Sequence, residues 1–248
     1  MKQKENIYLS QIRRKDCDTL SPEEYPLSIP VIKEFQSLQF RKSVTFIVGP
    51  NGSGKSTLLE AIAVLLNLNP EGGSKNFNFH TVETHSQLSD ALIASRADLS
   101  YKDAFFFRAE SYYNVASEID RIAESDYDMY NSYGGKSIHQ YSHGEGFMAL
   151  IRHRLNNKGL YLFDEPEAAL SFSNQLAFLC WMKEAVTAGA QLIIATHSPV
   201  VLSYPHATIY EIEDNVLKET TFEECSIYKD IYDYLFNREL YLKEMGLL

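Results

Sequence analysis

The fold is decided by nine consecutive residues: Gly49, Pro50, Asn51, Gly52, Ser53, Gly54, Lys55, Ser56 and Thr57. They match the pattern GxxxxGK[ST] and stand between an apolar run that predicts a strand over 40–48 and leucines at helical spacing. Glycines at these places let backbone N–H groups turn onto phosphate oxygens at the positive end of a helix. We therefore expect all nine to bind a nucleoside triphosphate, with Lys55 on the β- and γ-phosphates and the Ser56 hydroxyl on Mg²⁺.

Two adjacent acids, Asp164 and Glu165, follow the apolar run 160–163, which predicts a short buried strand. Such a strand would deliver Asp164 to the Mg²⁺ shell and leave Glu165 where a general base faces the γ-phosphate. Two carboxylates at the end of a buried strand are costly unless they are used. An exposed acidic turn is the alternative, and the phosphate-binding pattern in the same chain argues against it.

Composition excludes several classes of protein. The chain has 248 residues, of which 45% are hydrophobic and 23% charged, with 12 glycines and 8 prolines. These values are typical of a folded globular protein and exclude collagen-like and wholly disordered chains. A formal net charge of −10 argues against nucleic-acid binding by bulk electrostatics, although a local basic strip stays open. We expect no membrane insertion and, without a secretory leader at residues 1–6, a cytoplasmic location.

Hydrophobic periodicity predicts alternating strands and helices, and hence an α/β fold. Strands are expected over 6–13, 40–48, 104–107, 160–163 and 191–195, with a hairpin over 209–218. Helices are expected after Gly54, over 114–124, from 144 to about 155 and over 173–188, and a short one capped by Ser86 or Ser89 is expected to run through Leu92 and Ile93. We interpret residues 1–248 as a single domain with a helical lobe at about 79–157 and a C-terminal helical tail at about 221–248.

Five phrases carry a family resemblance: GPNGSGKSTLLEAIA, FFFRAES, SHGEGF, LFDEPEAALS and IIATHSP. In this order and at these spacings they resemble the ABC-type ATPases. They look most like the stand-alone bacterial ATPases of that class, which are related to the heads of the Rad50, SMC and RecF proteins. The resemblance covers about residues 40–213. It implies a P-loop fold with a central, mostly parallel sheet flanked by helices, a small antiparallel β part and a short helical lobe.

The resemblance also implies roles for residues outside the first motif. Ser142, His143, Gly144 and Glu145 resemble the signature motif, which binds the γ-phosphate held by a second subunit. Ser142 with Glu145 is also a capping box, and both interpretations can hold. His197 resembles the switch histidine that contacts the γ-phosphate and the attacking water, and it completes a catalytic set with Lys55 and Glu165.

Three further positions are less well matched to the family. Residues 168–171 resemble the loop that crosses the dimer interface, with Ser171 in place of the usual acid. The glutamine that bridges metal and water has no clear equivalent. Glu110 takes its place in the order of motifs and is expected near Mg²⁺, while Gln87 or neither residue are the alternatives. The aromatic ring that stacks on adenine could be Tyr25, with Phe35 and Phe40 as competitors.

Together these features predict hydrolysis of ATP to ADP and phosphate, with Mg²⁺, in a homodimer that forms when ATP binds. The process we favour is DNA maintenance or phage defence, in which the dimer moves an unidentified effector protein or nucleic acid. The alternatives are the ATP-binding subunit of a membrane transporter, or a switch that turns ATP over slowly.

Overall fold

The computed structural model describes residues 5–16, 24–73, 87–97, 100–110, 112–124, 130–131, 135–155 and 158–248. In chain order the elements are β1 (Leu9–Arg14), α1 (Pro30–Glu34), β2 (Ser37–Gln39), β3 (Val44–Val48), α2 (Lys55–Leu65), the 3-10 helix η1 (Gln87–Ala91), β4 (Leu92–Arg96), β5 (Asp103–Arg108), α3 (Tyr112–Ala123), η3 (Ile138–Gln140), α4 (His143–Arg154), β6 (Gly159–Asp164), η4 (Pro166–Ala169), α5 (Phe172–Ala188), β7 (Gln191–Ala195), α6 (Pro199–Leu202), β8 (Thr208–Glu213), β9 (Val216–Thr220), α7 (Ser226–Phe236) and α8 (Arg238–Glu244). They form the α/β fold that the sequence predicts.

A six-stranded sheet forms the centre of the molecule, in the order β5-β6-β7-β3-β8-β9. All neighbouring strands are parallel except β9, which pairs antiparallel with β8. Every residue of β3, β6 and β7 is buried, which explains why these strands read as continuous apolar runs in the sequence. Parallel strands end at the same edge of a sheet, so the loops after β3, β6 and β7 meet there.

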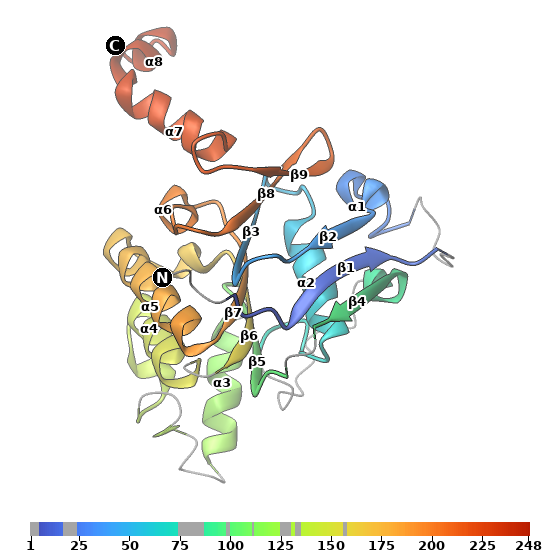
Figure 1. The fold of residues 1–248 in the computed structure, drawn as a ribbon. Helices are drawn as coiled ribbons and strands as arrows, with labels where there is room; N and C mark the ends of the chain where they lie inside the picture. Colours follow the sequence, from blue (N-terminus) through green and yellow to red (C-terminus); the bar gives the residue numbers. More distant parts are fainter. Residues whose placement is uncertain are drawn as a thin grey trace.

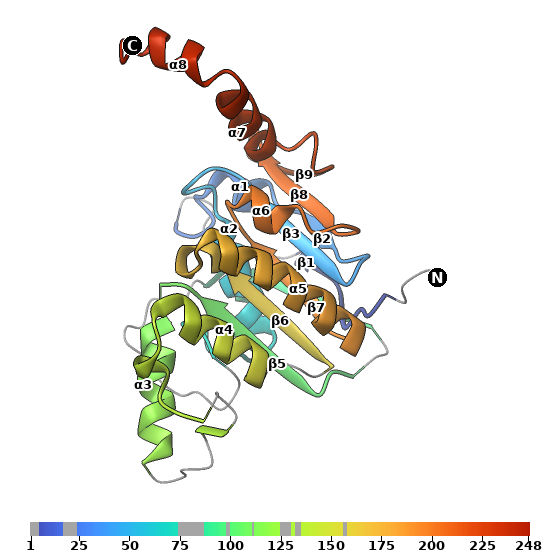
Figure 2. The ribbon, with the colours of Figure 1, turned by 90° about the vertical axis from the view of Figure 1, so that its left-hand side faces the viewer.

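Both faces of this sheet are covered, which gives three layers (Figure 1). Residues alternate between the two sides along each strand: Tyr161 and Phe163 pack into one core with α3, α4 and α5, while Leu160 and Leu162 pack into the other with α2. Figure 2 shows α4 and α5 lying over the face turned to the viewer, with α3 beside α4. The other face is covered by α2 and by the small sheet.

The small antiparallel sheet has the order β2-β1-β4. A buried side chain, Gln191 on β7, joins it to the central sheet. The Gln191 carbonyl oxygen accepts from the Tyr8 and Leu9 amides at 2.7 and 2.9 Å, and its amide group donates to the Leu9 carbonyl at 2.9 Å. One side chain therefore satisfies three backbone groups where β1 meets the other sheet.

Two expectations about local structure were wrong. The strand expected over 40–48 is confined to Val44–Val48, because the polar pair Arg41 and Lys42 separates it from β2. The helix expected through Leu92 and Ile93 is instead η1 followed by β4. The segment is too short for hydrophobic periodicity to distinguish a helix from a strand, and its pairing with β1 makes it a strand. In the region 79–157, interpreted above as a helical lobe, the described helices are η1, α3, η3 and α4, and the same region contributes β4 and β5 to the two sheets.

Among the described helices, none combines the length and the apolar character that crossing a membrane requires.

We expect Gln191→Leu to lower the free energy of unfolding by about 2–4 kcal/mol, because two buried amides and one carbonyl lose their partner. Urea denaturation would measure the change. The matched control is Gln39→Leu, at an exposed position of β2, where a loss below about 1 kcal/mol is expected. Equal losses in the two variants would contradict the bridging role of Gln191.

Candidate functional site: a phosphate-binding loop with an acidic cluster

The loop between β3 and α2 is shaped by glycines at positive φ. Gly54 caps α2 at φ 101°, and a Cβ there would lie 2.9 Å from Val31 Cγ1. Gly49 has φ 151°, and its Cβ would lie 2.8 Å from Ile212 Cβ. Side chains at either place would clash as well as strain the backbone. The glycine pattern is therefore required for the loop to turn tightly over the start of α2.

Lys55 begins α2 and is buried, with 4% of its surface exposed. Its ammonium donates to the Gly49 carbonyl at 2.9 Å and the Pro50 carbonyl at 2.8 Å. Burial lowers its pKa, while the negative charges of Glu165, Asp164 and Glu167 act in the opposite direction. The ammonium thus lies inside the loop that would surround a phosphate, held by two carbonyls that phosphate oxygens could replace.

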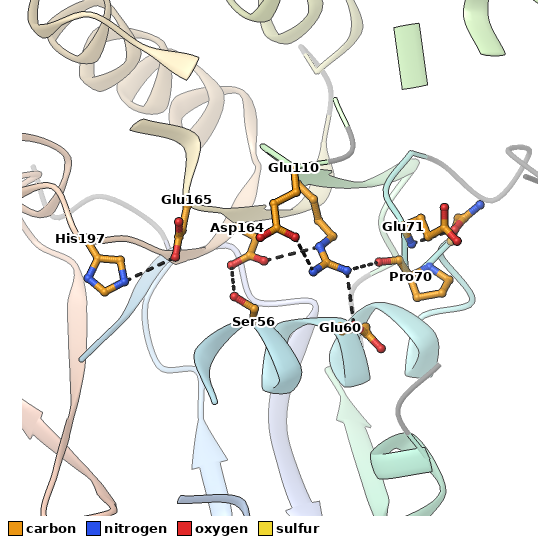
Figure 3. Close-up of polar contacts among 10 residues, drawn as sticks. Ser56, Glu60, Pro70, Glu71, Glu110, Asp164, Glu165 and His197 are labelled. Atoms are coloured by element: carbon orange, nitrogen blue, oxygen red, sulfur yellow. Dashed lines mark hydrogen bonds and ion pairs between the residues drawn. The ribbon is translucent and has the colours of Figure 1, made fainter. Parts of the chain in front are cut away.

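Asp164 ends β6 beside the first turn of α2. The Ser56 hydroxyl donates to its carboxylate at 3.0 Å (Figure 3). Burial raises the pKa of Asp164 to about 6, and the nearby Arg108 guanidinium and the Ser56 hydrogen bond limit the rise. A hydroxyl and a carboxylate at this separation provide two oxygen ligands of the kind that Mg²⁺ prefers.

Arg108, for which no sequence motif indicated a role, is the positively charged residue among the acids Glu60, Glu110 and Asp164. It ends β5 directly opposite Asp164 in the sheet, with its Nε 3.6 Å from that carboxylate. Its other nitrogens lie 3.4 Å from Glu60 and 3.6 Å from Glu110. Its guanidinium therefore partly compensates three acids that would otherwise repel one another.

Glu165 lies in the left-handed region at φ 50°, an uncommon conformation for a residue with a side chain. Its amide donates to the Ala195 carbonyl at 2.9 Å, and its carboxylate lies 3.4 Å from Nε2 of His197. Burial lowers the pKa of His197, with a contribution from Lys55 and an opposing one from Glu165. A lowered pKa favours the neutral imidazole at neutral pH.

Glu167, for which no sequence motif indicated a role, connects the turn after β6 to the turn after β7. Its carboxylate accepts from the Thr196 hydroxyl at 2.8 Å and from the His197 amide at 2.5 Å. Burial raises its pKa, and these hydrogen bonds oppose the rise. An acid followed by three apolar residues is a weak signal for such a role, because the contacts are made with residues 29 and 30 positions away.

Gln175 on α5 extends this connection to the expected interface loop. It accepts from the Ser198 hydroxyl at 2.6 Å and donates to the Leu170 carbonyl at 3.1 Å. Ser171, at the position where the family has an acid, caps α5 by accepting from the Asn174 amide at 3.3 Å. The loop 168–171 is thereby joined to the turn that carries His197.

Two adjoining cavities bring most of the predicted residues together. A cleft of about 540 Å³ is lined by Tyr25, Ile29, Asn51, Gly52, Gly54, Lys55, Ser56, Thr57, Glu110 and Glu165. A smaller cavity of about 200 Å³ is lined by Ser56, Ala109, Glu110, Asp164, Glu165 and Ala168. The larger volume is in the range of small-molecule sites. Glu110 faces both cavities with an exposed side chain, whereas the side chain of Gln87 lies outside the described residues.

The aromatic candidates separate by burial. Tyr25 is 64% exposed and lines the cleft, whereas Phe35 and Phe40 are buried in the core beside α1 and β2. Their rings are thus used in packing, and Tyr25 is the one of the three that an adenine base could reach.

The signature-like residues lie at the start of α4, apart from both cavities. The Glu145 carboxylate accepts from the Ser142 amide at 3.1 Å and from its hydroxyl at 2.6 Å. A Cβ at Gly144 would lie 2.7 Å from Asn174 Nδ2 and 3.1 Å from the Ala169 carbonyl, so this helix end packs closely on the loop 168–171. The side chain of His143 lies outside the described residues. Within one chain, these residues and the phosphate-binding loop are not brought together.

Comparison with known families now decides the assignment. A family model described as "AAA domain" matches residues 28–160, more than half of the chain, and includes the whole phosphate-binding loop. The chain belongs to this AAA domain family. A second model, described as "AAA domain, putative AbiEii toxin, Type IV TA system", matches residues 138–203 and includes Asp164 and His197. The AAA domain described here is thus a P-loop ATPase of the ABC type, which binds and hydrolyses ATP.

Individual relatives are more distant. The AAA domain is 28% identical over 170 residues to the cytochrome c biogenesis ATP-binding export protein CcmA of Nitrobacter winogradskyi, covering 62% of this chain and 78% of that protein. It is 28% identical over 223 residues to the macrolide export ATP-binding/permease protein MacB of Marinobacter nauticus, covering 81% of this chain but only 33% of that one. The chain therefore corresponds to about a third of the MacB protein. The SMC head domain from Thermotoga maritima is similar at a TM-score of 0.44 and 17% identity, over 87% of this chain and 99% of that one.

We expect Asp164→Asn to raise the free energy of unfolding at pH 7.5, by up to about 3 kcal/mol, while abolishing ATP hydrolysis. The folded-state pKa of Asp164 is raised to about 6 from 3.8, so burying the charged form costs stability above pH 6 and the cost fades toward pH 4. Urea denaturation at pH 7.5 and pH 4.5 would show an advantage for the variant that shrinks at the lower pH. Asp90→Asn, at an exposed site, is the control, and an advantage unchanged by pH would contradict the assignment.

We expect Glu167→Gln to lower kcat about tenfold with KM for ATP changed less than about twofold. The amide has one accepting oxygen, so it cannot serve the Thr196 hydroxyl and the His197 amide in the present geometry. Steady-state ATPase assays would measure both constants, with Glu184→Gln on the exposed side of α5 as the control. A rise in KM at unchanged kcat would show that Glu167 acts on binding rather than on the His197 turn.

Proposed function

We propose that ATP binds in the cleft of about 540 Å³, with its phosphates over residues 49–57 and its adenine near Tyr25. The observation that carries the proposal is the 3.0 Å contact between Ser56, which lines both cavities, and Asp164, which lines the smaller cavity beside this cleft. Among the described residues no group of three or more His, Cys, Asp or Glu side chains could hold a metal alone. That fits Mg²⁺, which takes one or two protein carboxylates and completes its shell with phosphates and water.

In this proposal Ser56 and Asp164 hold Mg²⁺, which neutralises charge on the phosphates when it is bound. Glu110 reaches the same cavity and would approach the metal through water after releasing Arg108. Lys55 exchanges the carbonyls of Gly49 and Pro50 for phosphate oxygens, an exchange favoured because both partners are then charged. Each of these residues already faces the cavity in which its partner would lie.

Glu165 is the general base in this proposal. Its carboxylate is partly exposed and borders both cavities, so it can reach a water beside the γ-phosphate. His197, 3.4 Å away and favoured in its neutral form, can donate to the γ-phosphate or hold the same water without repelling Lys55. Glu167 holds the backbone of His197 in place for this role.

The site is completed by a second copy of the chain. Ser142, His143, Gly144 and Glu145 stand at a helix N-terminus, which favours an anion, yet they lie apart from the cleft of their own chain. We therefore place them on the γ-phosphate of the partner, so that ATP is hydrolysed between two copies. The chain 1–248 acts as a single ABC-type domain in this arrangement, in the cytoplasm, where ATP is available.

The process served by hydrolysis has two candidates. A role in phage defence or DNA maintenance is supported by the second family match, whose description names a toxin–antitoxin system. A role as the ATP-binding subunit of a transporter is supported by curated relatives whose names describe export, among them CcmA and MacB. We favour the first because the family match over 138–203 spans the signature, the acid pair and His197 together. The effector in that case is a protein or nucleic acid yet to be identified.

Pairing two inactive variants tests the shared site. Glu165→Gln removes the base of its own site and keeps the signature, whereas Ser142→Asp keeps a good helix N-cap and puts a negative charge against the partner's γ-phosphate. We expect each variant alone to bind ATP and hydrolyse it at least 100-fold more slowly than the wild type. Co-purified in equal amounts, they should recover about a quarter of wild-type activity, since half the dimers then contain one intact site. A mixture as inactive as its parts would contradict hydrolysis between two copies.

A further inference from the structure

The C-terminal helices present an apolar surface that none of the described residues of the chain covers. In Figures 1 and 2, α7 and α8 extend away from both sheets, beyond β8 and β9. Both helices are described in full, and neither contains a buried residue. Nine large apolar side chains in this tail are 38–77% exposed: Ile231, Tyr232, Tyr234, Leu235, Phe236, Leu240, Met245, Leu247 and Leu248.

The tail is fixed at its root and unsupported beyond it. The Ser226 amide and hydroxyl both donate to Glu211 on β8, and Cys225 is fully buried. Phe222 and Ile227 pack against the core that lies between the central sheet and α3, α4 and α5. Tyr228 still contacts Phe222, and beyond it the apolar side chains contact one another, as in the stacked rings of Tyr228, Tyr232 and Phe236. The exposed surface is therefore held in a defined direction rather than on a loose end.

The residues of α7 are distributed as in an amphipathic helix whose apolar side packs against a partner. Seven of its eleven residues are apolar, and the remaining four, Ser226, Lys229, Asp230 and Asp233, lie together on one side at 3.6 residues per turn. The nine exposed side chains present on the order of 1,000 Å² of apolar surface, more than the largest patch on a typical monomer. A stable interface needs about 800 Å² from each partner.

We propose that this tail, residues 226–248, pairs with the tail of a second copy and holds two chains together without nucleotide. Apolar interfaces of this kind are typical of permanent homodimers, which most often form around a two-fold axis. The charges favour the same partner: the tail carries three basic and four acidic residues, whereas the whole chain has a net charge of −10. Two copies therefore repel one another least when they meet tail to tail.

A lipid surface fits the tail less well. Helices that lie on membranes carry lysines and arginines on their polar face. The polar side of α7 holds one lysine against two aspartates, so it would be repelled by anionic lipid. We therefore expect a protein surface to cover the tail. A second copy of the chain is the candidate, because the proposed hydrolysis of ATP between two copies already requires it.

Sedimentation equilibrium of the full chain tests the proposal, in EDTA and without nucleotide, where the ATP-dependent contact cannot form. We expect a species of twice 28.3 kDa at about 10 µM. The double variant Leu235→Lys, Phe236→Lys should weaken this dimer at least tenfold, because it places four charges in a two-fold interface. Asp230→Asn, which removes one negative charge on the polar side of the same helix and so also makes the tail more positive, should leave the dimer unchanged. A monomeric wild type, as expected if another protein covers the tail, would overturn the proposal, as would a dimer that resists the double variant.

Cross-linking locates the contact. Equal amounts of ¹⁴N- and ¹⁵N-labelled chains are mixed in urea, refolded together and treated with a lysine-reactive cross-linker, so that peptides of mixed label report contacts between copies. We expect mixed-label links between Lys229 and Lys243 of the two tails, with at least a tenfold loss in the double variant. Mixed links that join the tail to the body of the other copy, without tail-to-tail links, would overturn the arrangement. Neither of these two assays uses ATP, so a negative result in them would not contradict the proposed shared ATP site. In the same way, failure of the mixed-variant ATPase assay would not contradict the contact between tails.

Discussion

The parallel pairing of β6, β7 and β3 is the constraint on which the site depends. In this register Asp164 lies beside Ala195, and Ala195 lies beside Ile47, so one row of residues crosses three strands just before they end. The residues that follow this row on the three strands are Glu165, Thr196 and Val48, and the phosphate-binding loop begins at Gly49. A slip of one residue between any two strands would turn every side chain on the moved strand to the other face. Because all three strands are buried on both faces, the packing of the two cores opposes such a slip.

The second constraint is electrostatic. The edge of the sheet collects Asp164, Glu165 and Glu167 near a single lysine, and the pKa values of Asp164 and Glu167 are both raised. Arg108 and the hydrogen bonds from Ser56, Thr196 and the His197 amide make this cluster tolerable. Much of what stabilises the acids therefore also holds the turn that carries His197, and a net excess of negative charge remains at this edge. Burying these acids costs stability, and the remaining negative charge fits the Mg²⁺ and phosphate site proposed above.

The sequence predicted those features that are encoded locally. The turn 49–57, the buried strand before Asp164 and the helix ended by Gly189 each depend on a few adjacent residues, and each forms where it was expected. Arg108, Glu167 and Gln191 could not be found in this way, because their roles arise from residues 29 to 183 positions away. For the same reason β4 was mistaken for a helix: its strand pairing comes from β1, more than 75 residues earlier. Exposure, too, is a property of the fold, and it separates Tyr25 from the buried Phe35 and Phe40.

A nucleotide-independent contact between tails would change how ATP acts on the dimer. Without it, closing two copies around ATP is a bimolecular event, and it depends on the concentration of a protein that is acidic and self-repelling. With the tails paired, the two bodies stay at an effective concentration in the millimolar range, so closure becomes an intramolecular step. The binding energy of ATP is then used to bring together surfaces that are already neighbours. The tail and the phosphate-binding loop are linked through Glu211, which accepts from Ser226 and lies on β8 beside Val48, the last residue before the loop. The strand that anchors the first residue of the tail is thus hydrogen-bonded to the strand that leads into the phosphate-binding loop.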